Sequence, residues 1–69
     1  MSQARDLISK LKNDMFKHYL DAFNYAFSIG HISEGDPYMY MGFDSETNTI
    51  YFKHKITRQY KNLQITEEG

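Results

Sequence analysis

The chain has 69 residues, with eight basic and nine acidic side chains, a net charge of −1 and no cysteine. This length allows one small domain near the lower limit for a self-sufficient core, and the missing thiols exclude disulfides and cysteine-ligated zinc. The near-zero net charge excludes a generally basic nucleic-acid coat. No run reaches the roughly 18 apolar residues of a membrane span, so we expect a cytoplasmic protein with no membrane contact.

Residues 2–29 are predicted to be helical. Apolar residues recur there at steps of three and four, the pattern of one helix face, and the segment contains no glycine or proline. Ser2 is a candidate N-cap, and Gly30 is a candidate for the position just after the helix. Phe16, Leu20 and Phe27 widen the apolar stripe in its second half. The stripe assigned to the core or to a dimer seam consists of Ile8, Leu11, Met15, Tyr19, Ala22, Phe23 and Ala26.

A continuous helix of this length would be roughly 39 Å long, whereas a compact chain of this size has a diameter of roughly 28 Å. Two arrangements resolve the mismatch. Either the helix breaks at Asn13-Asp14, where an Asx cap could start a second helix, or a second chain covers the overhanging part. We favour a homodimer with the long helices packed together, because residues 15–29 are apolar on more than one side.

Residues 30–37 are predicted to be a loop, because they contain two glycines and end in Asp36-Pro37. Residues 38–57 then alternate with period two around the polar stretch 45–48, which predicts an antiparallel hairpin. The expected register pairs Asp44 with Thr49, Phe43 with Ile50, Met41 with Phe52 and Met39 with His54. It places Met39, Met41, Phe43, Ile50, Phe52 and Ile56 on the core side.

Residues 58–69 are expected to contain either a short third strand, with Leu63 and Ile65 pointing inward, or a turn of helix. A frayed tail follows. The predicted fold class is therefore α+β, with one long or kinked N-terminal helix followed by an antiparallel β-hairpin, in a single domain 1–69.

The second face of the hairpin is the candidate binding surface. From 53 to 61 the chain has four basic residues and no acidic one. Three interpretations are open: an ordinary solvated sheet face, a protein-binding surface, since tyrosine and arginine are favoured at interface anchors, or a nucleic-acid-binding surface that stacks bases and meets phosphates. The candidate partner-binding residues are Tyr38, Tyr40, Tyr51, Lys53, Lys55, Arg58 and Lys61, and Tyr60 continues the same composition.

No catalytic or metal-binding pattern stands out. His18, His31 and His54 have neither the i, i+4 helical spacing nor the His-x-His strand spacing of a metal site. The serines lie where capping explains them, and no glycine-rich phosphate loop occurs. We therefore predict no catalytic residue, no metal and no cofactor.

These features predict a small non-enzymatic binding or regulatory protein. It would be homodimeric through its helix and would recognise a larger protein through the Tyr/Lys face of the hairpin. The alternative is a small nucleic-acid-binding protein that uses the same face plus Arg58 and Lys61.

Overall fold

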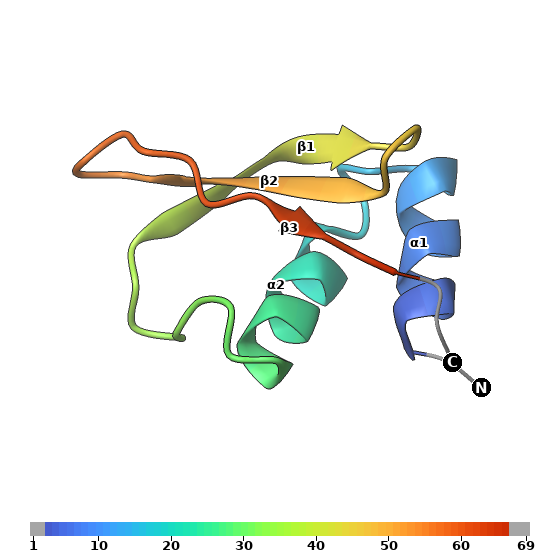
Figure 1. The fold of residues 1–69 in the computed structure, drawn as a ribbon, viewed down its shortest axis with the longest axis horizontal. Coiled ribbons are helices and arrows are strands. Elements are labelled where there is room, and N and C mark those ends of the chain that lie inside the picture. The colour runs from blue at the N-terminus through green and yellow to red at the C-terminus, as the bar shows by residue number, and fades with distance from the viewer. Residues whose placement is uncertain (1–2, 67–69) are drawn as a thin grey trace.

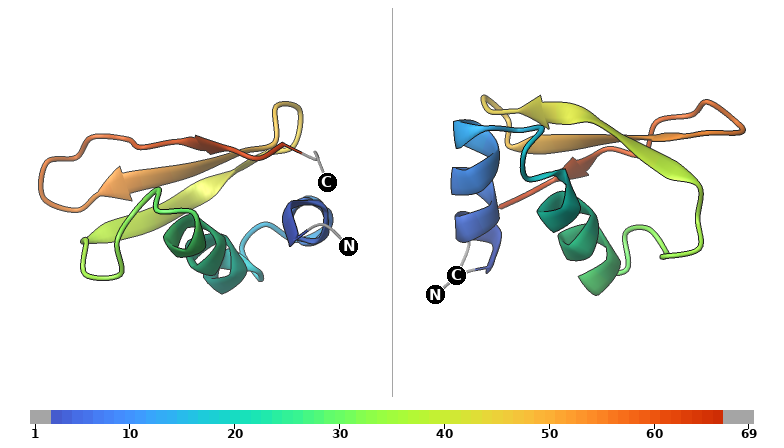
Figure 2. Two further views of the ribbon diagram at one scale, coloured as in Figure 1. Left: turned by 60° about the horizontal axis from the view of Figure 1, so that its bottom comes forward. Right: turned by 180° about the vertical axis from the view of Figure 1, so that it is seen from behind.

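The computed structural model describes residues 3–66. Both helices lie against one face of a three-stranded antiparallel sheet with the order β1-β2-β3 (Figure 1; Figure 2, left). The elements are α1 (Gln3–Asn13), α2 (Tyr19–Ser28), β1 (Tyr38–Asp44), β2 (Thr49–His54) and β3 (Leu63–Gln64). The α+β prediction is confirmed, with two helices in place of one long helix.

Two predicted features lie outside the described residues, namely the N-cap at Ser2 and, except for Thr66, the frayed tail at 66–69. Among residues 3–66, neither helix is long and apolar enough to cross a membrane.

The helix breaks after Asn13, where the sequence allows an Asx cap. Residues 14–18 are not α-helical, and the Asp14 carboxylate accepts a hydrogen bond of 3.1 Å from the backbone N–H of Lys17. Such a local bond offers the backbone an alternative to the helical ladder. A straight helix that overhangs the domain is therefore absent. The helix length therefore no longer supports the predicted helix-paired dimer, which stays a prediction.

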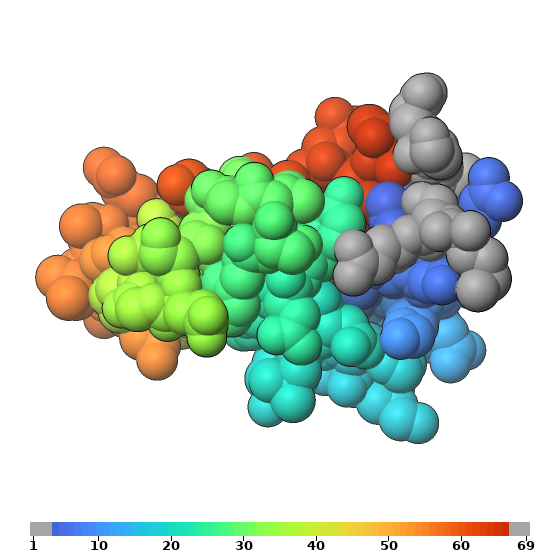
Figure 3. Space-filling model, turned by 90° about the horizontal axis from the view of Figure 1, so that it is seen from below, coloured from blue at the N-terminus to red at the C-terminus, as the bar shows by residue number. Residues whose placement is uncertain are grey.

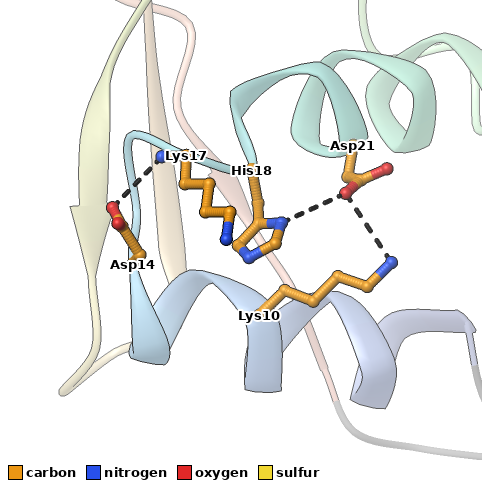
Figure 4. Close-up of polar contacts among 5 residues, drawn as sticks. All are labelled: Lys10, Asp14, Lys17, His18 and Asp21. Atoms are coloured by element: carbon orange, nitrogen blue, oxygen red, sulfur yellow. Dashed lines mark hydrogen bonds and ion pairs between the residues drawn. The ribbon is translucent and has the colours of Figure 1, made fainter.

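The two helices are joined across the break by charged side chains. Lys10 Nζ at the end of α1 and His18 Nδ1 before α2 both lie 3.6 Å from the same carboxylate oxygen of Asp21 (Figure 4). All of these groups are partly exposed, so the cluster orients the helices more than it stabilises them.

The predicted end of the second helix is confirmed at Gly30. Its φ of +75° is a conformation that glycine adopts without steric penalty. The N–H of His31 donates to the carbonyl of Ala26 at 2.9 Å, and the N–H of Gly30 donates to that of Phe27 at 3.1 Å. These two bonds form a Schellman motif, which satisfies the last helical carbonyls.

The core lies between the helices and the inner face of the sheet. It includes four of the predicted stripe residues, so these side chains are covered by their own chain. Met15 and Phe23 are half-buried against the core, and Tyr19 is 44% exposed. The buried apolar residues are Ala4, Leu7, Ile8, Leu11, Ala22, Ala26, Ile32, Phe43, Ile50, Phe52 and Ile65.

The hairpin register is as predicted near the turn and wrong farther from it. A β-bulge at Met41 places one extra residue in β1, and Gly42 beside it has a φ of +136°. Because a slip of one residue moves every later side chain to the other face, the predicted core positions of Met39 and Met41 are wrong. The observed pairs are Tyr38 with His54, Met39 with Lys53, Tyr40 with Phe52, Gly42 with Tyr51, Phe43 with Ile50 and Asp44 with Thr49.

The expected short third strand is present. β3 pairs with β2 through Ile50 opposite Leu63, and Ile65 just after it is buried, as predicted. Ile56 is 76% exposed in the turn that follows β2, so its predicted place in the core is wrong. The strand pairing ends before that residue and does not carry it to the inner face.

Candidate functional site

The bulge moves two predicted tyrosines off the candidate face. Tyr38 and Tyr40 lie on the inner, helix-covered side of the sheet. The Tyr40 ring centroid is 6.4 Å from that of Phe52, and the Tyr38 ring meets the His54 ring edge-on at 5.0 Å. Met39 takes the outer position between them.

Tyr51 and Lys53 remain on the outer side of β2, opposite to the inward Phe52. No helix in residues 3–66 covers this side (Figure 1). Tyr60 joins them through a bridge to Lys53, whose ammonium lies 5.4 Å from the Tyr60 ring centroid. We call Tyr51, Lys53 and Tyr60 the open face. The arrangement presents two tyrosine rings and one lysine, whose ammonium lies over the Tyr60 ring.

Arg58 and Lys61 lie in the segment that connects β2 to β3, and both side chains are exposed. The backbone beneath them is ordered by hydrogen bonds, from the N–H of Arg58 to the carbonyl of His54 at 2.9 Å and from the N–H of Lys61 to that of Phe52 at 2.8 Å. Arg58 has a φ of +65°, which is uncommon for a residue with a side chain. Two cations are thereby held on the segment that also carries Tyr60.

A second surface lies under the edge of the sheet. A groove of about 350 Å³ separates β1 from the start of α2. Seen from the helix side (Figure 3), the cyan residues that follow α1 project from the molecule, and a recess separates them from the orange residues after β2. This β1 groove is lined by Phe16, Tyr19, Phe23, Tyr38, Met39, Tyr40 and Lys55. It therefore gathers three predicted partner-binding residues that the open face lacks, Tyr38, Tyr40 and Lys55.

Large apolar side chains are exposed in the lining of this groove, at Phe16 and Tyr19, and at residues next to lining residues in the sequence, Leu20 and Met41. Phe16 is 63% exposed and Leu20 is 61% exposed, while Tyr19 and Met41 are 44% and 41% exposed. The Phe16 ring still meets the Tyr40 ring edge-on, at a centroid distance of 6.1 Å. The sequence places Phe16 and Leu20 in the buried stripe, and no local signal separates them from residues that are buried.

Tyr40 has an unusual environment for a tyrosine. Its hydroxyl is buried and makes no hydrogen bond within the described part of the chain. Burial raises the pKa of Tyr40 to about 12 from an ordinary 10.0, because the phenolate loses its hydration there. A buried hydroxyl normally has a hydrogen-bond partner, so this group destabilises the fold slightly.

The histidines have structural roles. His54 Nδ1 accepts hydrogen bonds from the backbone N–H groups of Ile56 and Thr57, at 3.2 and 3.1 Å, and so holds the turn after β2. His31 Nε2 lies 3.1 Å from the carbonyl oxygen of Lys61 and so links the loop after α2 to the segment that connects β2 to β3. Within residues 3–66 no three His, Asp or Glu side chains are grouped to hold a metal ion.

One signal in the sequence points to the bulge. Gly42 interrupts an otherwise regular strand pattern, and an isolated glycine in a strand often marks a bulge. A Cβ at this position would lie 3.7 Å from the Met15 sulfur, which is ordinary contact. The positive φ, rather than lack of space, is what the glycine supplies here.

The chain matches no protein-family model, no curated protein and no solved structure. The chemical roles of the open face and the β1 groove therefore follow only from the geometry of their own residues.

Proposed function

We propose that this chain is a small non-enzymatic protein-recognition module, cytoplasmic in location, that binds an acidic surface of a larger protein through its open face. The observation that carries the proposal is the placement of Tyr51, Lys53 and Tyr60 side by side on the uncovered side of the sheet. Arg58 and Lys61 on the adjoining segment add exposed positive charge. The sequence predicts a homodimer paired through its helices, and a different dimer seam, along β1, is proposed separately below.

The chemistry of the open face suits this role. Tyrosine offers a large, rigid and amphipathic contact area at low conformational entropy. Lys53 is already held against the Tyr60 ring, so less side-chain freedom is lost when a partner binds. The cations favour an acidic partner and raise its rate of association.

The test is capture of partners by the immobilised protein, with and without nuclease. We expect Tyr60→Ala to weaken retention at least about tenfold, the effect of losing one interface anchor, and nuclease to have no effect. Tyr60 is 54% exposed, so the substitution should leave the fold intact, which circular dichroism can verify. The matched charge variants are Lys53→Gln on the open face and Lys12→Gln on α1, where Lys12 is exposed.

Binding that survives both Tyr60→Ala and Lys53→Gln, or that Lys12→Gln weakens equally, would contradict the proposal. Retained material that disappears on nuclease treatment would favour the second candidate function.

That second candidate is single-stranded nucleic-acid binding by the same face. It draws on the combination of two outward tyrosines with Lys53, Arg58 and Lys61, since aromatic rings stack on bases and cations meet phosphates. Affinity for a labelled single-stranded oligonucleotide should then fall with salt, by a slope of about 0.7 per neutralised phosphate. Lys61→Gln should lower that slope by about one such step. A salt-independent affinity would exclude this function.

A further inference from the structure

β1 is an edge strand with outward-facing backbone groups. Phe52 and His54 use their carbonyls on the β3 side, where they accept from the N–H groups of Lys61 and Arg58. Residues in an antiparallel ladder alternate between bonding to one neighbour and to the other. The β1 residues opposite these two, Tyr40 and Tyr38, therefore turn their backbone groups away from β2, to a side where residues 3–66 supply no strand.

The outward-facing backbone groups of β1 include a hydrogen-bond donor and an acceptor that a second strand can match. The N–H of Tyr38 already donates to the carbonyl of Asp36 at 2.9 Å. The outer edge before the bulge is thus left with the carbonyl of Tyr38 and the N–H and carbonyl of Tyr40. A second β1 strand, antiparallel to the first and centred on Met39, presents the same groups in the complementary order.

The charge pattern of this edge suits pairing with itself. Natural edge strands usually carry charges that prevent such pairing, but residues 38–43 contain none. A two-fold axis brings the side chains closest to it near their own copies, so charges on the axis would repel. The one charged residue of the β1 groove, Lys55, lies beside Pro37 rather than at the centre on Met39.

The apolar area favours a partner larger than a single peptide. Phe16, Tyr19, Leu20 and Met41 are four of the seven exposed large hydrophobic residues among those described. With on the order of 200 Å² per large side chain, their exposed fractions amount to roughly 400 Å² per copy. Leu20 and Met41 lie outside the lining of the β1 groove, so a strand lying in the groove alone would leave them uncovered.

We propose that β1 pairs antiparallel with β1 of a second copy, around a two-fold axis at Met39. The N–H of Tyr40 in each copy donates to the carbonyl of Tyr38 in the other. Phe16 and Tyr19, which line the groove of each copy and are exposed, pack against those of the other copy beneath the joined sheet.

The dimer has a consequence for recognition. An axis perpendicular to the sheet keeps both open faces on the same side, so one continuous sheet presents two copies of Tyr51, Lys53 and Tyr60. A partner with repeated acidic sites would then be bound bivalently. The pairing itself stands independently of the proposed function, because mass and binding are measured separately.

The test is the mass of the full chain in solution, by light scattering and sedimentation at micromolar concentrations. We expect a dimer for the wild type, and at least tenfold weaker association for Phe16→Lys, which places an unpaired charge in the groove at the seam. Ile56→Lys is the matched control, because Ile56 is also exposed but lies in the turn after β2. Amide exchange should show the Tyr40 N–H protected in the dimer and open on dilution.

Three results would each overturn the proposal. The first is a monomeric mass at every concentration, which would leave the edge to a foreign extended peptide or to solvent. The second is a dimer that Ile56→Lys disrupts and Phe16→Lys does not. The third is a dimer whose Tyr40 amide exchanges as fast as in the monomer, which would place the seam elsewhere, for example along the helices.

Discussion

The two helices use their apolar residues in opposite ways. α1 has four charged residues, yet its apolar residues Ala4, Leu7, Ile8 and Leu11 are all buried. α2 has one charged residue, Asp21, but only two of its residues, Ala22 and Ala26, are fully buried. The more apolar helix therefore leaves the larger apolar surface exposed.

The difference follows from which side chains meet the sheet. Ala22 and Ala26, the fully buried residues of α2, are small, and the larger side chains of this helix are at most half-buried. Phe23 reaches the core at its side, with its ring centroid 5.2 Å from that of Phe52. Tyr19 lines the β1 groove. An apolar stripe thus shows that a face is to be covered, but not by which chain.

The largest expected difference between the two helices is in the free energy of unfolding that is lost when a leucine is truncated to alanine. Leu11→Ala on α1 removes a side chain that is 1% exposed, and we expect it to lower the free energy of unfolding by about 2–5 kcal/mol. Leu20→Ala on α2 removes one that is 61% exposed and should change the monomer by less than about 0.5 kcal/mol. Urea denaturation at low protein concentration measures both. Equal losses would show that α2 is more deeply packed than described.

The end of α2 should depend on a single glycine. Gly30→Ala introduces a side chain at a φ of +75°, which should cost about 1–2 kcal/mol. Gly35→Ala is the matched control in the same loop, where φ is not positive and no atom lies within 4 Å of the added Cβ. Thermal unfolding should show a lower midpoint for the first variant only. A neutral Gly30→Ala would mean that the loop can take another conformation.

The Tyr40 hydroxyl offers a smaller effect with a pH signature. Tyr40→Phe removes a buried group without a partner and should raise the free energy of unfolding by up to about 1 kcal/mol. Tyr19→Phe, at an exposed tyrosine of the same groove, should be neutral.

Because burial raises the pKa of Tyr40 to about 12, the unfolded tyrosine loses its proton from about pH 10 while the folded one keeps it. Deprotonation of Tyr40 in the unfolded chain therefore lowers the free energy of unfolding progressively between about pH 10 and 12, and it has no effect below about pH 10. Phenolate absorbance and unfolding curves across this range measure it. A decline of the same size in Tyr40→Phe would assign it to other groups.

The weakest expected effect is at the charged link between the helices. Lys10→Gln removes a partner 3.6 Å from Asp21, with both side chains about half exposed. We expect a loss of less than about 0.5 kcal/mol that fades with added salt. A loss several times larger would mean that this link, rather than core packing, holds α1 against α2.

The sequence alone determined the features that depend on neighbouring residues. The helix end at Gly30, the hairpin turn and the pairs closest to it follow from local patterns, and the structure contains them. The break after Asn13 is one of two arrangements that the sequence allows, and not the one that it favours. Each rests on the conformational preference of one residue or on a hydrogen bond within a few residues. Such preferences act before the chain is folded.

Only the tertiary structure decided which face each tyrosine occupies. The bulge at Met41 separates Tyr38 and Tyr40 from Tyr51, and α2 buries two alanines while Leu20 on this helix and Phe16 before it stay exposed. Both outcomes depend on where the helices dock against the sheet. The alternation of residue types favours the regular register, because a one-residue shift exchanges the two faces of a strand, so contacts between distant segments must select the bulged one.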